Sequence, residues 1–213
     1  MNRRFLTNLA TGVLVSFALA SVVQAQSADE TADGLVKRLS TDVLETIKAD
    51  KSIQTGDTAK VVSLVETKVM PHVNFERMTA SAVGPGWRQA TAEQKKRLQE
   101  EFKILLVRTY SGALSQVSDQ TISLKPFRTS AEDKEVVVKT EIRGHGDPIQ
   151  LDYRLEKTPG QGSGWKIYNL NVLGVWLVET YRSQFAQEIS ARGIDGLITA
   201  LGDRNKANSA KKG

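Results

Sequence analysis

The residues that could carry acid–base or metal chemistry are few in this chain of 213 residues. Cysteine is absent and the only histidines are His72 and His145, which excludes thiol nucleophiles, disulfides and Cys/His zinc sites. His72 follows Pro71 at the expected end of a helix, and His145 is flanked by glycines in an expected turn. Neither has an acidic residue at ligand spacing, so both are interpreted as surface or capping residues.

Motifs of the common enzyme classes are also absent from the sequence. There is no Gly-x-Ser-x-Gly, no Walker loop and no His-Glu-x-x-His. The glycine-rich residues 160–164 lead into an expected strand rather than a helix, which predicts a hairpin loop and not a phosphate loop. Asp147, Asp152 and Asp195 are expected in a turn, on the solvent face of a strand and at a helix start. The sequence therefore predicts a protein that is not an enzyme, with no metal and no cofactor.

The first 25 residues have the three parts of a secretory signal peptide. Arg3 and Arg4 form a basic start, residues 13–20 form an apolar run, and the small residues Val23 and Ala25 suit signal peptidase. Polar residues dilute this stretch, whereas a spanning helix needs roughly 20 predominantly apolar residues. We predict cleavage after Ala25 and export of a soluble protein.

The composition indicates an ordinary globular protein. Hydrophobic residues make up 40% of the chain and charged residues 25%, enough for a real core. The net charge is +5, part of which comes from the expected signal peptide. Nucleic acid is not an expected partner, because the protein is expected to be exported.

The apolar period changes from helical to alternating at about residue 120. Before it, helices are expected over 30–49, from Asp57 to Pro71, and from the capping box of Thr91 and Gln94 onward, with an irregular segment over 71–86. After it, alternation predicts four antiparallel strands, and helical spacing returns from residue 177 with an end at Gly193. A last short helix is expected over 194–201. The expected strands are 122–124, 136–142, 149–155 and 165–172.

These elements predict an α+β fold with a curved four-stranded antiparallel sheet packed against about five helices. A single domain is expected over residues 26–202, followed by a disordered basic tail over 203–213. The dry strand faces and the wide apolar arc of the long helix supply much apolar surface on one side. Periodicity alone leaves open whether this surface is a packed core or the lining of a cavity.

A resemblance to a known family bears on that choice. Six segments, in order, resemble MlaC and its toluene-tolerance relatives, a family of periplasmic phospholipid carriers. Two positions depart from the family: Asn74 stands where Asp is frequent, and Trp176 stands where a small Ser is frequent. The matching segments are 69–78, 86–94, 109–110, 165–169, 174–185 and 193–198.

The resemblance implies an NTF2-like cone that holds acyl chains in an apolar cavity between sheet and helices. It implies a shuttle that carries glycerophospholipid between an outer-membrane lipoprotein–porin complex and an inner-membrane ABC transporter with an MCE-domain protein, which maintains outer-membrane asymmetry. Two alternatives stay open: an NTF2-like periplasmic enzyme on a small apolar substrate, or a cavity-free adaptor or chaperone.

The cavity interpretation also predicts which side chains contact the acyl chains. They are the inward positions of the strands and helices. Five arginines are expected on wet faces or in loops, where they either are solvated or meet phosphate or an acidic partner: Arg77, Arg88, Arg143, Arg154 and Arg182. The predicted lipid contacts are Met78, Phe102, Leu106, Tyr110, Val138, Leu151, Tyr153, Ile167, Val172, Val175, Trp176, Tyr181 and Phe185.

Overall fold

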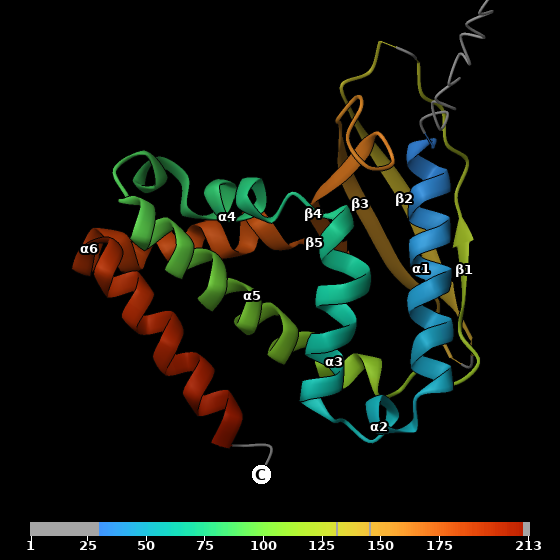
Figure 1. The fold of residues 1–213 in the computed structure, drawn as a ribbon, viewed down its shortest axis with the longest axis horizontal. Coiled ribbons are helices and arrows are strands. Elements are labelled where there is room, and N and C mark those ends of the chain that lie inside the picture. Colours follow the sequence, from blue (N-terminus) through green and yellow to red (C-terminus); the bar gives the residue numbers. More distant parts are fainter. Residues whose placement is uncertain (1–29, 131, 145, 211–213) are drawn as a thin grey trace, which may run out of the picture.

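The protein is described by a computed structural model that covers residues 30–130, 132–144 and 146–210. The predicted signal peptide and His145 lie outside these residues. Helices form one side of the molecule and a single antiparallel sheet the other (Figure 1). This arrangement confirms the predicted α+β class. None of the described helices is long and apolar enough to cross a bilayer.

The sheet is a meander in which each strand pairs with the next along the chain. Its four long members match the predicted strands, and the structure adds a fifth strand of two residues. The fifth forms because a two-residue turn at Leu173 and Gly174 reverses the chain. The strands are β1 Thr121–Leu124, β2 Glu135–Arg143, β3 Ile149–Lys157, β4 Trp165–Val172 and β5 Val175–Trp176.

A register shift in the β3–β4 pair changes which side chains of β4 face the helices. Leu155 pairs with Ile167, whereas Arg154 pairs with Asn169, so Tyr168 is the extra residue of a β-bulge. Beyond the bulge, Leu170 lies opposite Tyr153. The inward positions of β4 therefore step from Ile167 to Leu170 rather than following strict alternation.

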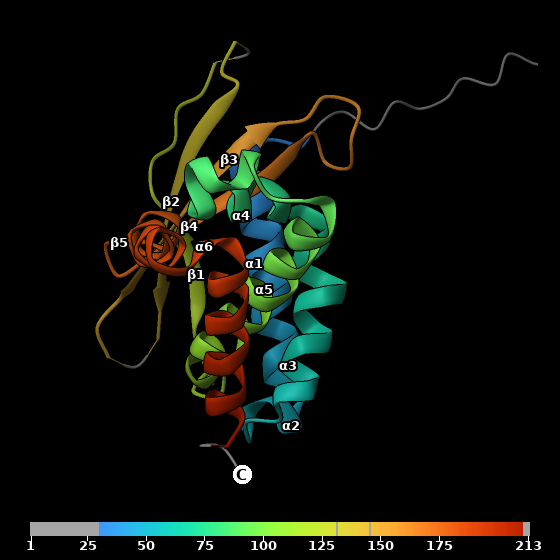
Figure 2. The same ribbon diagram turned by 90° about the vertical axis from the view of Figure 1, so that its left-hand side faces the viewer.

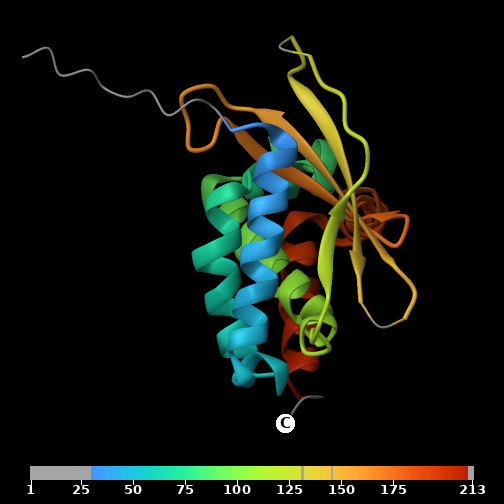
Figure 3. The same ribbon diagram turned by 90° about the vertical axis from the view of Figure 1, so that its right-hand side faces the viewer.

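The first helix covers part of the inner face of the sheet, and two short helices follow it. The helix α1 (Ala32–Ala49) packs on β1 and β2 (Figure 3). Thr31 caps its N-terminus, because the Thr31 hydroxyl accepts a hydrogen bond from the Gly34 amide. The helices α2 (Lys51–Gln54) and α3 (Thr58–Leu64) follow, and the Asp57 carboxylate caps α3 as predicted. A π-helical turn, Val65–Val69, and a 3₁₀ turn, Met70–His72, carry the chain to Pro71 and end the helix there.

The segment after Pro71 is helical, which corrects the predicted irregular stretch over 71–86. Helix α4 spans Phe75–Val83, and the Asn74 side chain caps it by accepting from the Arg77 amide. Sequence periodicity missed this helix because it has little more than two turns. The long helix α5 (Ala92–Leu114) begins at the predicted capping box of Thr91 and Gln94.

The last helix, α6 (Leu177–Ala210), is broken at Gly193, whose φ of 70° lies in the left-handed region. Figure 2 looks down the first half of α6 and shows the second half from the side. The second half continues past residue 203, so the predicted disordered tail is wrong for residues 203–210. Tertiary contacts explain the helix: the buried Asn205 side chain donates to Glu101, and Arg108 donates to the Asn205 carbonyl.

Candidate functional site

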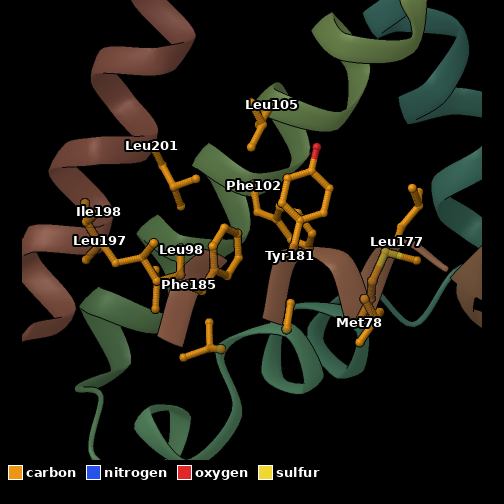
Figure 4. Close-up of a cluster of buried hydrophobic side chains, with 13 residues drawn as sticks. Met78, Leu98, Phe102, Leu105, Leu177, Tyr181, Phe185, Leu197, Ile198 and Leu201 are labelled. Atoms are coloured by element: carbon orange, nitrogen blue, oxygen red, sulfur yellow. The ribbon is translucent and has the colours of Figure 1, made fainter. Parts of the chain in front are cut away.

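A buried aromatic cluster joins the helices α4, α5 and α6. Phe102 lies at its centre, with ring centroids 5.0 Å from Tyr181, 5.2 Å from Phe185 and 5.8 Å from Phe75. The rings of Tyr181 and Phe185 meet Phe102 edge to face, a favourable geometry for aromatic pairs. Figure 4 shows these rings together with Met78 from α4. Four of the predicted lipid contacts, Met78, Phe102, Tyr181 and Phe185, thus form one packed wall.

A second cluster joins α1 to the inner face of the sheet. It contains three more of the predicted contacts, Val138, Tyr153 and Ile167, all buried. The Tyr153 hydroxyl shares a hydrogen bond of 3.0 Å with Ser40 of α1. Burial raises the pKa of Tyr153 to about 12, so its hydroxyl stays neutral at physiological pH.

Burial on the inner face of the sheet is lowest beside the hairpin that joins β2 and β3. Where Val138 pairs with Tyr153 both side chains are buried, but in the pair of Ile142 and Ile149 the first is half-buried and the second is 41% exposed. Leu151 lies between these pairs and is half-buried. The inner face is therefore covered at one end and open at the other.

Helix α5 shows the same gradient. Its first apolar residues, Leu98, Phe102 and Leu105, are fully buried, whereas Leu106 and Tyr110 are only half-buried. The packing of α5 is mainly with α6, α4 and α3 rather than with the sheet. Leu106 and Tyr110 thus pack against the aromatic cluster without being fully covered.

We call this set of half-buried side chains the apolar band. Its members pack against the two buried clusters but are themselves only partly covered, so a ligand could still contact them. Leu170 packs against both buried clusters and so connects them. The apolar band comprises Leu106, Tyr110, Leu151, Leu170 and Val172.

Leu170 is the member of the band that the sequence prediction missed. Strict alternation from Trp165 places position 170 on the outer face, and the bulge at Tyr168 moves it inward. The sequence does carry a signal for this change. The apolar positions are odd-numbered at Trp165 and Ile167 and even-numbered at Leu170 and Val172, so the alternation shifts by one residue between them.

Two predicted contacts lie outside the clusters. Val175 on β5 is 51% exposed and belongs to no buried cluster. Trp176 is half-buried, and the guanidinium of Arg154 lies 4.0 Å from its ring centroid. Both lie outside the clusters because β5 is a short edge strand beyond the turn at Leu173 and Gly174.

An ordered charged network lies where α4 meets the sheet. The Arg77 guanidinium contacts Glu135 and Glu156 at 2.5 Å each and lies 3.6 Å from the centroid of the Tyr168 ring. The Tyr168 hydroxyl donates to Glu135 at 2.8 Å. Hydrogen bonds from Arg77 and Tyr168 lower the pKa of Glu135, which stabilises the carboxylate.

Most of the arginines expected on wet faces have protein partners. Arg154 pairs with Glu179, Arg143 pairs with Glu141, and Arg182 donates to the Ser81 carbonyl. Burial opposes ionisation of Glu179, but hydrogen bonds from Asn169 and Arg154 outweigh it and lower the pKa. The Arg154 contact joins β3 to α6 and the Arg182 contact joins α6 to α4, whereas Arg143 and Glu141 both lie on β2.

The lowered pKa of Glu135 predicts an acid-sensitive contribution to stability. The contribution is present above the ordinary pKa of a glutamate and is lost as the pH falls through the lower folded-state pKa. We expect the E135Q protein to be less stable than wild type by about 0.5 kcal/mol at pH 7, since the side chain is half-exposed. Urea unfolding at several pH values checks this. The difference should shrink as the pH falls below the ordinary pKa of a glutamate, and a difference that stays constant as the pH is lowered contradicts the assignment.

The groups considered for chemistry do not come together. His72 is half-buried, and burial together with Arg38 and Lys166 lowers its pKa. Asp152 is buried instead of lying on a solvent face, and accepts from the Gln150 side chain and the Thr140 amide. Over the described residues, no group of three or more His, Cys, Asp or Glu side chains could hold a metal ion.

Two surface grooves lie away from the apolar band. One, of about 430 Å³, runs between α5 and the second half of α6 and is lined by residues such as Arg97, Glu101 and Lys206. The other, of about 570 Å³, is an open depression along α1 that includes Lys37 and Asp42. Neither contains a predicted lipid contact.

Comparison with known proteins agrees with this architecture. The chain is 24% identical over 196 residues to the "Intermembrane phospholipid transport system binding protein MlaC" of Haemophilus influenzae, covering 91% of this chain and 89% of that protein. It is 27% identical over 189 residues to the "Toluene tolerance protein ttg2D" of Pseudomonas putida, covering 88% and 85%.

A solved structure has the same fold. The phospholipid-binding protein from Ralstonia solanacearum, determined in complex with a phospholipid, is 46% identical to this chain with a TM-score of 0.80. The match covers 85% of this chain and 99% of that one. Residues 37–203 match the family described as "MlaC protein", which is most of the described fold. This chain therefore belongs to the MlaC family.

Proposed function

We propose that this protein binds a phospholipid with its acyl chains in the apolar band and carries it between membranes. The observation that carries the proposal is the band itself: apolar side chains half-covered between a packed helical wall and a covered sheet face. The phospholipid held by the related Ralstonia protein, which shares 46% of its sequence with this chain, supports the same occupant. The names of the other relatives describe binding, transport and toluene tolerance.

The energetics suit a carrier better than a permanent binder. Burial of each methylene from water is worth about 0.8 kcal/mol, so about 28 methylenes would exceed the strongest known affinities. The lipid comes from another apolar environment, however, so the free-energy difference between the bilayer and the protein is far smaller. Exchange in either direction then needs no chemistry in the protein, which agrees with the scattered titratable groups.

In this proposal, the seven predicted contacts that are buried in the two clusters support the binding site and do not themselves touch the lipid. Leu106, Tyr110, Leu151, Leu170 and Val172 contact the acyl chains. The polar head group stays in water at the open end of the sheet, near Ile142 and Ile149. Val175 and Trp176 lie beyond this opening.

The proposal extends to location and partners. The predicted signal peptide would export the chain to the periplasm, where the inner-membrane ABC transporter with its MCE-domain protein and the outer-membrane lipoprotein–porin complex would exchange lipid with it. The bound phospholipid is cargo and not a cofactor.

Native mass spectrometry of the purified protein tests the function. We expect a co-purifying mass of phospholipid size, in about one copy per chain. Incubation with labelled vesicles should then move intact label into the protein fraction. Protein without bound lipid that also fails to extract it would remove the carrier proposal. Release of fatty acid or a head-group fragment would favour the enzyme alternative.

A further inference from the structure

The turn between β4 and β5 holds a leucine in a conformation that leucine disfavours. Leu173 has a φ of 52° and Gly174 a φ of 85°, and Leu173 is the only non-glycine residue with positive φ in the described part of the chain. Two positive φ angles in a two-residue hairpin turn are what a type I′ turn needs, for which Asn-Gly is the preferred pair. The left-handed conformation costs a side chain with a Cβ roughly 1–2 kcal/mol.

The Leu173 side chain is also 65% exposed. An exposed leucine recovers little free energy from packing, so neither backbone preference nor burial accounts for its presence. Its amide donates to the Gln150 carbonyl at 3.0 Å, which fixes the turn against the start of β3. The strained position therefore displays an apolar side chain on a rigid support.

Two more exposed aliphatic side chains lie beside it. Val175 follows the turn and is 51% exposed, and Ile149 adjoins Gln150 and is 41% exposed. We call Ile149, Leu173 and Val175 the apolar tip. The tip continues the apolar band outward, because Val172 pairs with both Leu151 and Val175.

The border of the tip is typical of a surface that enters the interfacial region of a bilayer. Trp176 follows Val175, and the Arg154 guanidinium lies on its ring. Tryptophan prefers the membrane interface, and arginine extends its charge toward the head groups. Arg154 and the nearby Arg143 are both paired with glutamates, so little unpaired positive charge adjoins the tip.

We propose that the apolar tip inserts into the surface of a phospholipid bilayer and opens a path for an acyl chain into the apolar band. This inference rests on the proposed carrier function. A bilayer fits better than a stably bound protein, because three side chains are far too few for a stable interface of about 800 Å² on each side. Because Arg154 and Arg143 are already paired with glutamates, we expect the contact to depend on apolar insertion and only weakly on anionic lipid.

The test uses a substitution that separates insertion from folding. L173N removes the apolar side chain and places at this φ a residue that tolerates it. Extraction of a fluorescent phospholipid should be measured from vesicles of phosphatidylcholine, with and without one quarter phosphatidylglycerol. We expect L173N to extract about fivefold more slowly on both vesicles, from the lost burial of one partly inserted leucine.

Three measurements keep the outcome specific. The urea midpoint of L173N should equal or exceed that of wild type, and the lipid bound after long equilibration should be unchanged. V62N removes an exposed aliphatic side chain from α3 and should extract like wild type. L173G, also compatible with this φ, replaces L173N if the latter folds poorly.

Either of two results would overturn the tip as a bilayer contact. One is extraction by L173N within twofold of wild type; the other is a rate that follows phosphatidylglycerol content and not residue 173. The first result would indicate that the tip contacts a protein partner and not a bilayer. Failure of the wild-type protein to bind lipid at equilibrium would instead contradict the carrier function. The equilibrium measurement detects this outcome separately from the extraction rate.

Discussion

Replacing Phe102 by alanine should destabilise the lipid-free protein by about 3–5 kcal/mol. Phe102 is fully buried and its ring contacts Phe75, Tyr181 and Phe185, so truncation opens a cavity at the junction of three helices. For a domain of this size the loss corresponds to a fall in Tm of roughly 10 °C. Thermal unfolding of delipidated protein, followed by circular dichroism, measures it.

The matched control is Leu106→Ala on the same helix. Leu106 is only half-buried, so its truncation should cost clearly less stability and should instead reduce the bound lipid. Delipidated protein is essential, because lipid that binds only the folded state raises Tm by mass action. Equal destabilisation by the two changes would show that Leu106 belongs to the packed core and not to the apolar band.

Introducing a carboxylate at Leu106 should abolish lipid binding. A charge in the apolar band loses its water when an acyl chain lies beside it, and this desolvation costs several kcal/mol. About 3 kcal/mol is sufficient for a hundredfold loss of affinity. Native mass spectrometry of L106E should therefore show lipid-free protein, and vesicle extraction should fall to background.

Ile104→Glu supplies the control on the same helix. Ile104 is two residues away, hence on the opposite side of α5, is 37% exposed and lines the polar groove along α6. I104E should keep its lipid and most of its stability. Retention of lipid by L106E, or equal loss by both variants, would place the acyl chains elsewhere.

The elements of this protein were largely predictable from local patterns. The capping box at Thr91 and Gln94, the aspartate cap at Asp57 and the break at Gly193 act within a few residues, so they are visible in sequence. Alternation gave the four long strands for the same reason. The family resemblance was confirmed over residues 37–203. The cleavage after Ala25 and the domain boundaries at 26 and 202 stay predictions.

Long-range contacts decided where the helices extend. Residues 203–208 look like a polar tail in sequence, but the bonds between Asn205 and Glu101, over a hundred positions apart, hold them in α6. Asn205 gains these contacts only after α5 and α6 pack together. Helical spacing of apolar residues carries no record of a polar contact of this kind.

Tertiary structure alone also distinguished the apolar band from the core. Phe102 and Leu106 are equivalent in sequence, as inward residues of one amphipathic helix, and both were predicted to contact lipid. Only Phe102 is fully covered, because side chains of α4 and α6 pack on it, whereas Leu106 packs against the same cluster and stays half-buried. The β-bulge at Tyr168 likewise turned Leu170 inward, and the turn at Leu173 left Val175 exposed. Sequence determined which side chains are apolar and which element each one lies on. The packing of distant elements decided which of them are covered, because burial depends on what lies opposite and not on periodicity.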